Sequence, residues 1–181
     1  MTESNNPIEV RPAVLSDGET ILSLWQTAAR WLLAKGIEQW KPEYFNIGQI
    51  KEWMDSGADI FIASIDGEAV GTLLICWTDP SVWEELNSED AGYIHRFAVS
   101  RTHTNAGVGR YLLAWAEREI EARGKKMARL DCMADNTALN SYYQSNGYVQ
   151  VATRHWSNGW RANLYEKEIA KSNEVQANSF T

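Results

Sequence analysis

One short stretch of this chain limits the folds open to it more than any other. Residues 93–117 read YIHRFAVSRTHTNAGVGRYLLAWAE and begin with a strand-like run over Tyr93–Val99. Two glycines, Gly107 and Gly109, end the polar loop that follows, and apolar residues then recur at helical spacing up to Arg123. The segment predicts a strand, a glycine turn and a helix in direct succession, which is typical of α/β proteins.

Two further pairs of strands are predicted to be joined by two-residue turns. Asp66-Gly67 lies between the strand-like runs Ile60–Ile65 and Ala69–Trp77, and Asn158-Gly159 separates residues 148–156 from 160–168. Such pairs are strong signals of a β-hairpin, because both turn residues adopt positive φ. The other predicted elements are strands at 8–14 and 127–133, and helices that are capped by Ser16, Asn46 and Asn136 and end before Gly36, Gly57 and Gly147.

The order of these elements mixes hairpins with strand–helix–strand units, so we expect an α/β fold with a mixed sheet and helices on its faces. With 181 residues, 44% hydrophobic and 23% charged, the chain has the size and composition of one folded domain rather than of a disordered segment. We expect that domain to cover residues 7–168, with flexible termini at 1–6 and 170–181.

Composition argues against several classes of function. The chain has no run of 18 apolar residues and no signal-peptide pattern, so we expect a cytoplasmic protein with no membrane partner. Cys76 and Cys132 form neither a CxxC pair nor a zinc-ligand spacing with the three histidines, so we expect no metal. The net charge of −7 argues against nucleic-acid binding.

Charge is divided unevenly along the chain. Residues 1–90 hold 16 acidic and 5 basic side chains, whereas residues 91–181 hold 8 acidic and 12 basic ones. We expect the first half to attract amines and the second half to attract phosphates, unless the asymmetry is only accidental surface composition. The glycine turn suits a phosphate, because its N–H groups and the helix dipole converge there, with Arg101 and Arg110 nearby. The alternative is a plain helix start.

The usual nucleotide motifs do not fit this turn. A dinucleotide fingerprint needs glycine where Leu112 stands, and no Walker loop occurs. The segment instead resembles the acyl-CoA motif of the GNAT superfamily of N-acetyltransferases. That resemblance is carried by Phe97-Ala98-Val99, Thr104-Asn105-Ala106-Gly107-Val108-Gly109 and Leu112-Leu113, and by a second signature, Asn136-Thr137-Ala138 followed by Tyr143, Gly147 and Tyr148.

The resemblance covers roughly residues 7–168 and agrees with the predicted order of elements. It implies a GNAT-like mixed, mostly antiparallel sheet flanked by about four helices, and transfer of acetyl from acetyl-CoA to a primary amine. One position departs from the pattern, because Thr104 stands where the family usually has Arg or Gln. A phosphate contact is then lost or supplied by Arg110.

The resemblance also implies roles for the matched positions. The backbone of Phe97–Val99 is expected to pair with the pantetheine arm, and Asn136 to bind near pantetheine or the thioester. Tyr143 is expected to protonate the departing thiolate, so that acetyl passes directly to the amine; its neighbour Tyr142 then faces away, since adjacent helical side chains point about 100° apart. The pyrophosphate-binding residues so implied are Thr104, Asn105, Ala106, Gly107, Val108, Gly109 and Arg110.

His95 stands where several members of the family carry a glutamate. Because an imidazole accepts protons near neutral pH, we expect His95 to act as the general base or to bind the acceptor. Strand alternation places it on one face with Tyr93 and Phe97. The alternatives are a histidine satisfied inside the sheet and a water relay that ends at a carboxylate of the first half.

Trp31, Trp40 and the acidic loop 79–90 are expected to contact the acceptor, since aromatic rings and carboxylates attract cations. Trp25 and Trp53 are expected in the core, and Cys132 is expected to be a packed thiol. These features favour a small cationic amine as acceptor. The alternatives are a protein N-terminal or lysine acetyltransferase and an inactive CoA-binding sensor. By analogy with small enzymes of this type, we expect a homodimer.

Overall fold

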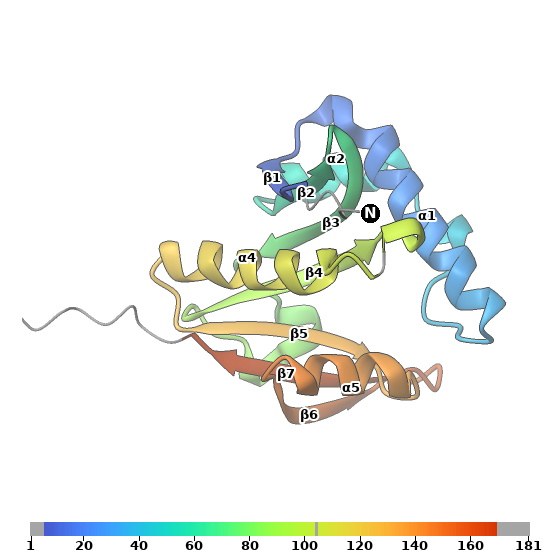
Figure 1. Ribbon diagram of the computed structural model, residues 1–181. Helices are drawn as coiled ribbons and strands as arrows, with labels where there is room; N and C mark the ends of the chain where they lie inside the picture. The colour runs from blue at the N-terminus through green and yellow to red at the C-terminus, as the bar shows by residue number, and fades with distance from the viewer. Residues whose placement is uncertain (1–5, 104, 170–181) are drawn as a thin grey trace, which may run out of the picture.

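The computed structural model describes residues 6–103 and 105–169, whose strands form one seven-stranded sheet (Figure 1). The strand order is β1-β2-β3-β4-β5-β7-β6, and all neighbouring pairs are antiparallel except β4 and β5. The prediction of a mixed, mostly antiparallel sheet is therefore confirmed. The strands are β1 (Glu9–Pro12), β2 (Asp59–Ile65), β3 (Glu68–Cys76), β4 (Ala91–Val99), β5 (Met127–Met133), β6 (Val149–His155) and β7 (Arg161–Glu168).

Both predicted hairpins are present. Asp66 and Gly67 have φ angles of 51° and 79°, the left-handed values that suit a tight turn between β2 and β3. Gly159, in the turn between β6 and β7, has φ of 86°. The second hairpin does not simply extend the sheet, because β7 pairs with β5 and leaves β6 at the edge.

Two of the three predicted helix caps are correct. The side chains of Asn46 and Asn136 accept hydrogen bonds from the third residue of their helices, at 3.1 and 3.2 Å. The predicted cap at Ser16 is wrong, because a 3₁₀ turn over Leu15–Asp17 precedes the first helix and the Asp17 carboxylate pairs with Arg11. The helices are α1 (Gly18–Ala34), α2 (Ile47–Asp55), α3 (Pro80–Trp83), α4 (Val108–Ala122) and α5 (Thr137–Ser145).

The helices cover both faces of the sheet. α4 and α5 contribute to a core on one face, with Leu112 and Tyr143 packed against residues such as Leu73. α1 and α2 contribute to the core on the other face, where Trp25 and Ile50 pack against residues such as Leu74. The alternation of neighbouring β3 residues between these two cores follows from the two-residue period of a strand. Trp25 is completely buried, as predicted.

The sheet divides between β4 and β5. Their parallel pairing spans four residue pairs and ends at Ile94 and Leu130, although both strands continue beyond that point. The fork therefore leaves the last residues of β4 without a strand partner on one side. The two arms of the fork, α1 and the ends of α4 and α5 surround this opening (Figure 1).

The predicted termini lie mostly outside the described residues. Within the segment 1–6, Asn6 is described, and its amide donates to the carboxylate of Asp66. In the part of the chain that the structure describes, no helix has both the length and the apolar character needed to cross a membrane.

Candidate functional site

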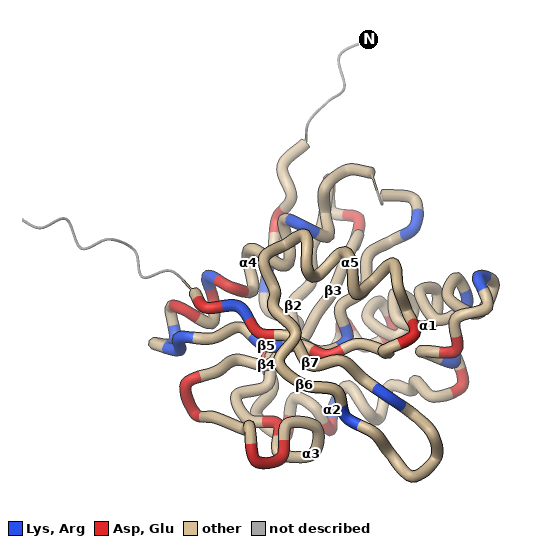
Figure 2. Tube along the Cα trace, turned by 90° about the horizontal axis from the view of Figure 1, so that it is seen from below, with Lys and Arg blue, Asp and Glu red and all other residues tan. Residues whose placement is uncertain are grey.

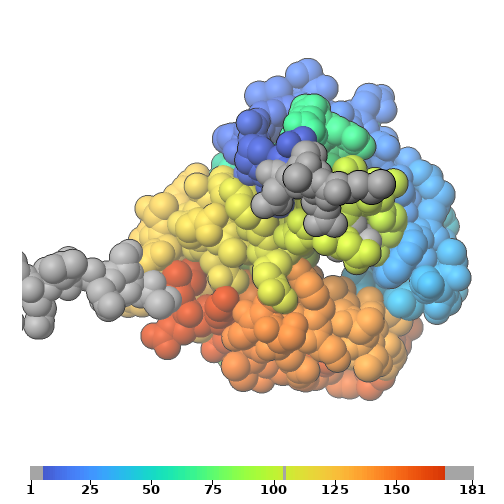
Figure 3. Space-filling view, in the orientation of Figure 1, coloured from blue at the N-terminus to red at the C-terminus, as the bar shows by residue number. Residues whose placement is uncertain are grey.

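The glycine turn forms one wall of a cavity of about 560 Å³. Figure 3 shows it as a hollow between α1, the start of α4 and α5. Gly107 caps α4 with φ of 74°, a left-handed conformation that favours glycine. Of the residues assigned to the turn, Asn105, Gly107, Gly109 and Arg110 line the cavity, whereas Thr104 lies outside the described residues.

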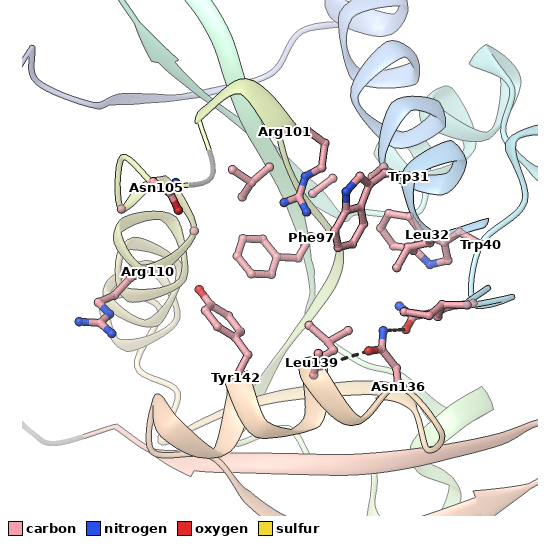
Figure 4. A pocket seen from close by; sticks show the side chains of 18 residues that line it. Trp31, Leu32, Trp40, Phe97, Arg101, Asn105, Arg110, Asn136, Leu139 and Tyr142 are labelled. Atoms are coloured by element: carbon pink, nitrogen blue, oxygen red, sulfur yellow. Dashed lines mark hydrogen bonds between the residues drawn. The ribbon is translucent and has the colours of Figure 1, made fainter. Parts of the chain in front are cut away.

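Tyr142 faces the glycine turn (Figure 4). A Cβ atom on Gly109 would lie 3.0 Å from the Tyr142 hydroxyl oxygen, so the glycine leaves room for the ring. That hydroxyl is buried and has no hydrogen-bond partner among the described residues. An unsatisfied donor beside a turn of N–H groups fits a ligand rich in oxygen atoms. The prediction that Tyr142 faces away from this site is therefore wrong.

The end of β4 runs along the same cavity. Phe97, Ala98 and Val99 line it, and they lie beyond the point where β4 stops pairing with β5. On the other side, Ala98 and Val99 still pair with β3. An extended ligand in the fork could thus add main-chain hydrogen bonds to β4, as an additional strand does.

A bulge in β4 changes the faces of its side chains. Arg96 has φ of 52°, and Thr72 and Leu74 of β3 pair with Ala98 and His95, so two β4 residues oppose one on β3. Phe97 consequently packs in the α4 core while Tyr93 packs in the α1 core. The prediction that His95, Tyr93 and Phe97 share one face is wrong for Phe97, because strand alternation breaks at the bulge, whereas His95 stacks on Trp53 beside the core that holds Tyr93.

The Arg96 side chain lies over aromatic rings on the α1 face. Its guanidinium carbon is 4.8 Å from the centre of the Phe45 ring and 5.8 Å from that of Trp25. Burial lowers the pKa of Arg96, and Asp131 opposes that shift. The two rings supply cation–π attraction to the buried guanidinium.

His95 lines a second cavity, of about 300 Å³. Its Nε2 atom lies 3.0 Å from Oδ2 of Asp79, a buried residue. Asp131 completes a group whose ligand atoms all lie within 4.8 Å of one another. That spacing would admit a divalent cation, and the direct contact between Asp79 and His95 also allows a proton to be shared between them.

Burial and hydrogen bonding act in opposite directions on the carboxyl groups of this second cavity. Burial would raise the pKa of Asp79, but His95, Ser81 and the N–H of Val82 together lower it, so that Asp79 is held ionised. Burial raises the pKa of Asp131, with His95 and Arg96 opposing the shift and Asp79 adding to it. The two neighbouring carboxyl groups therefore differ in how readily they ionise.

Tyr143 also lines the second cavity and is buried. Burial first, and then Cys132, Tyr142 and Asp131, raise the pKa of its phenol, so the phenol keeps its proton at neutral pH. Burial raises the pKa of Cys132 to about 12. Cys132 is thus a packed thiol and a poor nucleophile at neutral pH, in agreement with the sequence.

The two cavities adjoin each other. Gln39, Trp40, Phe97 and Leu139 line both of them. Asn136 lies beside the larger cavity, with its side-chain nitrogen donating to Gln39 at 2.9 Å and its oxygen capping α5. The Asn136 side chain thus fastens the segment after α1 to the start of α5, a role that sequence reasoning missed.

The predicted tryptophans separate in space. Trp40 lines both cavities, whereas Trp31 lines the larger one, where the Arg101 guanidinium lies 4.2 Å from the centre of its ring. Trp31 therefore lies apart from the cavity of His95, and its assignment to the acceptor stays a prediction. Trp53 is partly buried and packs at the margin of the α1-side core, as predicted, and it also stacks on His95 at 6.0 Å between ring centres.

The acidic loop reaches the second cavity through its first residues. Asp79, Ser81 and Val82 line that cavity, and Asp and Glu gather along the segment around α3 (Figure 2). Neither the Asp79–His95 contact nor the place of Asp131 has a signal in sequence spacing, because the three residues come from separate elements. Only the acidic character of the loop pointed to Asp79.

Comparison with known proteins gives consistent results. A family model described as "Acetyltransferase (GNAT) family" matches residues 24–148. The "Uncharacterized N-acetyltransferase YesJ" of Bacillus subtilis (strain 168) is 34% identical over 165 residues, which cover 87% of this chain and 88% of YesJ.

Solved structures share the fold. A GNAT acetyltransferase from Listeria monocytogenes is 28% identical, with a TM-score of 0.74 and coverage of 93% of this chain and 98% of that one. The Escherichia coli ribosomal-protein-S18-alanine N-acetyltransferase is 17% identical, with a TM-score of 0.69 and coverage of 97% and 100%. Salmonella typhimurium yncA, solved with its cofactor acetyl-CoA, is 15% identical, with a TM-score of 0.64 and coverage of 95% and 99%. The fold expected from the sequence is confirmed.

Proposed function

Because the chain belongs to the acetyltransferase (GNAT) family, we propose that it transfers acetyl from acetyl-CoA to the primary amine of a small cationic acceptor. The observation that carries the proposal is the pair of adjoining cavities at the fork of the sheet. One is lined by a glycine turn suited to phosphates, and the other by a histidine and two carboxyl groups. Two substrates bound in them would meet at Phe97 and Leu139.

The larger cavity fits acetyl-CoA, which supplies an activated acetyl thioester when bound. The N–H groups of the turn that includes Gly107 and Gly109 would hold the pyrophosphate, and the Tyr142 hydroxyl offers an additional donor. The free side of Phe97–Val99 would pair with the pantetheine arm. In Figure 4, Arg101 points toward Phe97 and Arg110 points away from it, so Arg101 is the better placed for this cavity.

The smaller cavity supplies the proton chemistry. Attack needs a neutral amine, and His95 is the residue that we expect to accept a proton from the ammonium. Tyr143 holds a proton that we expect it to give to the departing sulfur. The acceptor nitrogen loses two protons as the ammonium becomes an amide. His95 takes the first, and the second returns to Tyr143 and restores its phenol. The acetyl group passes directly between substrates, and we propose no role for Cys132 as a carrier.

The walls of the smaller cavity favour a cationic acceptor. Asp79 and Asp131 contribute carboxyl groups, and Trp40, Trp53 and Trp160 contribute aromatic rings. Carboxylates and aromatic faces both attract an ammonium group. A cavity of about 300 Å³ suits a small molecule. No metal is part of this proposal, and we propose a cytoplasmic enzyme that forms a homodimer.

The test is release of CoA thiol from acetyl-CoA in the presence of separate acceptors. The panel holds diamines and polyamines, aminoglycosides, free amino acids, and peptides with a free N-terminus or an internal lysine. We expect turnover with small cationic amines. Turnover with peptides alone would replace this proposal by protein acetylation, and binding of acetyl-CoA without turnover on any acceptor would identify a sensor.

A further inference from the structure

The imidazole of His95 is held from two sides. The indole of Trp53 stacks against it, with 6.0 Å between ring centres and 23° between ring planes. Oδ2 of Asp79 approaches Nε2 at 3.0 Å. Together these contacts restrict both the tilt of the ring and its rotation.

Asp79 is itself fixed by its own segment. Its Oδ1 atom accepts hydrogen bonds from the Ser81 hydroxyl at 3.0 Å and from the N–H of Val82 at 3.4 Å. Its own N–H donates to the side chain of Asn87 at 2.9 Å. The other oxygen, Oδ2, is buried and lies 3.0 Å from Nε2 of His95, and no other described residue donates a hydrogen bond to it.

We propose that Asp79 is a positioning residue for His95, a proposal that rests on the proposed function of His95 as the base. Asp79 holds the tautomer in which Nε2 carries a proton, and this leaves the lone pair of Nδ1 to accept a proton from the acceptor's ammonium. The carboxylate then stabilises the imidazolium that results. A carboxylate that orients a catalytic histidine in this way is a recurrent solution in enzymes.

The other groups around His95 do not supply the same effect. Asp131 faces it from β5, but burial raises the pKa of Asp131, which makes it the weaker anion. Arg96, the next residue on β4, is positively charged and so is not an anion that could stabilise an imidazolium. Tyr143 faces the cavity from α5, and its phenol keeps its proton. Trp53 packs against His95 from α2 and carries no charge. Asp79 is the group that stays ionised despite burial, because its hydrogen bonds favour the carboxylate.

Asp79→Asn isolates this role. Asparagine keeps an oxygen for Ser81 and Val82 and is as good a helix cap as aspartate, but its amide nitrogen offers Nε2 a donor instead of an acceptor. We expect kcat/KM for the acceptor to fall roughly 10- to 100-fold, with the KM for acetyl-CoA unchanged. The acid limb of the pH profile should move to lower pH, because a neutral amide stabilises the imidazolium less than a carboxylate does.

A double-mutant cycle separates positioning from structure. If Asp79 acts through His95, the double variant Asp79→Asn/His95→Ala should be as active as His95→Ala alone. Glu68→Gln removes an exposed charge at the start of β3, where it lines neither cavity, and should match the wild type. An acid limb that stays in place, or a double variant whose loss is the product of the two single losses, would overturn the proposal. Loss of activity after EDTA treatment would also overturn it, since the cluster would then serve a cation.

A second readout does not depend on turnover. Nitrogen-15 NMR of the ring of His95, assigned with His95→Ala, should show a protonated Nε2 and a bare Nδ1 in the wild type at pH 8, and this preference should be lost in Asp79→Asn. If no amine is acetylated but this signature is present, the proposed function fails while the Asp79–His95 pair stands. An Nδ1–H tautomer in the wild type would contradict the pair itself.

Discussion

The two adjacent tyrosines of α5 serve different cavities. Tyr142 meets the glycine turn, whereas Tyr143 lines the cavity of His95. Their side chains point to different sides of the helix, as those of neighbouring helical residues must. Each side of the helix lines one of the two cavities. Their phenols can therefore be tested as a matched pair.

We expect Tyr143→Phe to lower kcat by about 10²-fold or more with little change in acetyl-CoA affinity, because it removes the proton donor and keeps the ring. Tyr142→Phe should mainly weaken the affinity for acetyl-CoA, with a smaller effect on kcat. Steady-state kinetics and calorimetry on both variants measure the two effects. Unchanged turnover in Tyr143→Phe would remove its role as general acid.

We expect the ionised carboxylate of Asp131 to lower the stability of the folded protein. Because burial raises its pKa, the folded state is penalised once the pH exceeds the unfolded-state pKa of the carboxyl group, and the penalty is complete above the folded-state pKa. Asp131→Asn should therefore raise Tm at pH 7 by about 2–4 °C, the shift that corresponds to about 1 kcal/mol. The gain should vanish in acid, where the carboxyl group is protonated in both states.

The same Asp131→Asn variant should bind cationic acceptors less well, seen as a higher KM at pH 7. Asp135→Asn, an exchange on the exposed loop after β5, is the control for both measurements. A lower Tm together with unchanged KM would mean that Asp131 is an ordinary structural residue.

The sequence predicts the hydrogen-bond partners of some buried polar side chains but not of others. The caps at Asn46 and Asn136 are local, so their spacing to the helix predicts them. Asn140 donates to the carbonyl groups of Met133 and Asn136 and accepts from Asn163 and from the hydroxyl of Tyr165 at 2.6 Å. This network joins α5 to β7, more than 20 positions away, and no local pattern indicates it.

Among the elements, the start of α4 makes the sharpest prediction. A Cβ on Gly109 would lie 3.0 Å from the Tyr142 oxygen and 3.6 Å from a methyl group of Val99. We expect Gly109→Ala to weaken acetyl-CoA binding and Gly109→Val to weaken it further, by about tenfold or more, which corresponds to about 1.4 kcal/mol. Calorimetry measures the affinity and thermal melting confirms the fold. Wild-type affinity in Gly109→Val would place the pyrophosphate elsewhere.

Element boundaries were predictable where turn chemistry is local. Asp66-Gly67 fixed a hairpin, and Met127–Met133 was predicted with its observed bounds. The bulge at Arg96 was not, because an extra residue in β4 is defined only against the register of β3. The 3₁₀ turn before α1 depends on Arg11 and Asp17 meeting across six residues, which a helix-cap pattern does not include.

In the molecule as a whole, the two cavities adjoin at Trp40, Phe97 and Leu139. If these cavities hold the two substrates as proposed, transfer needs both bound together, because Cys132 is too poor a nucleophile to carry the acetyl group. Initial rates measured against both substrates should therefore give intersecting double-reciprocal lines. Parallel lines, or a protein that gains 42 Da (about one acetyl group) from acetyl-CoA without an acceptor, would indicate a covalent carrier instead.

The pairing of β4 with β5 ends after four residue pairs, so the two strands share no main-chain hydrogen bonds beyond Ile94 and Leu130. A pantetheine chain seated there would supply main-chain bonds that the protein lacks on its own. The coenzyme would then be a structural tie as well as a reagent. Binding of the coenzyme should slow amide hydrogen exchange along Phe97–Val99, and its release after each turnover should make that exchange faster again.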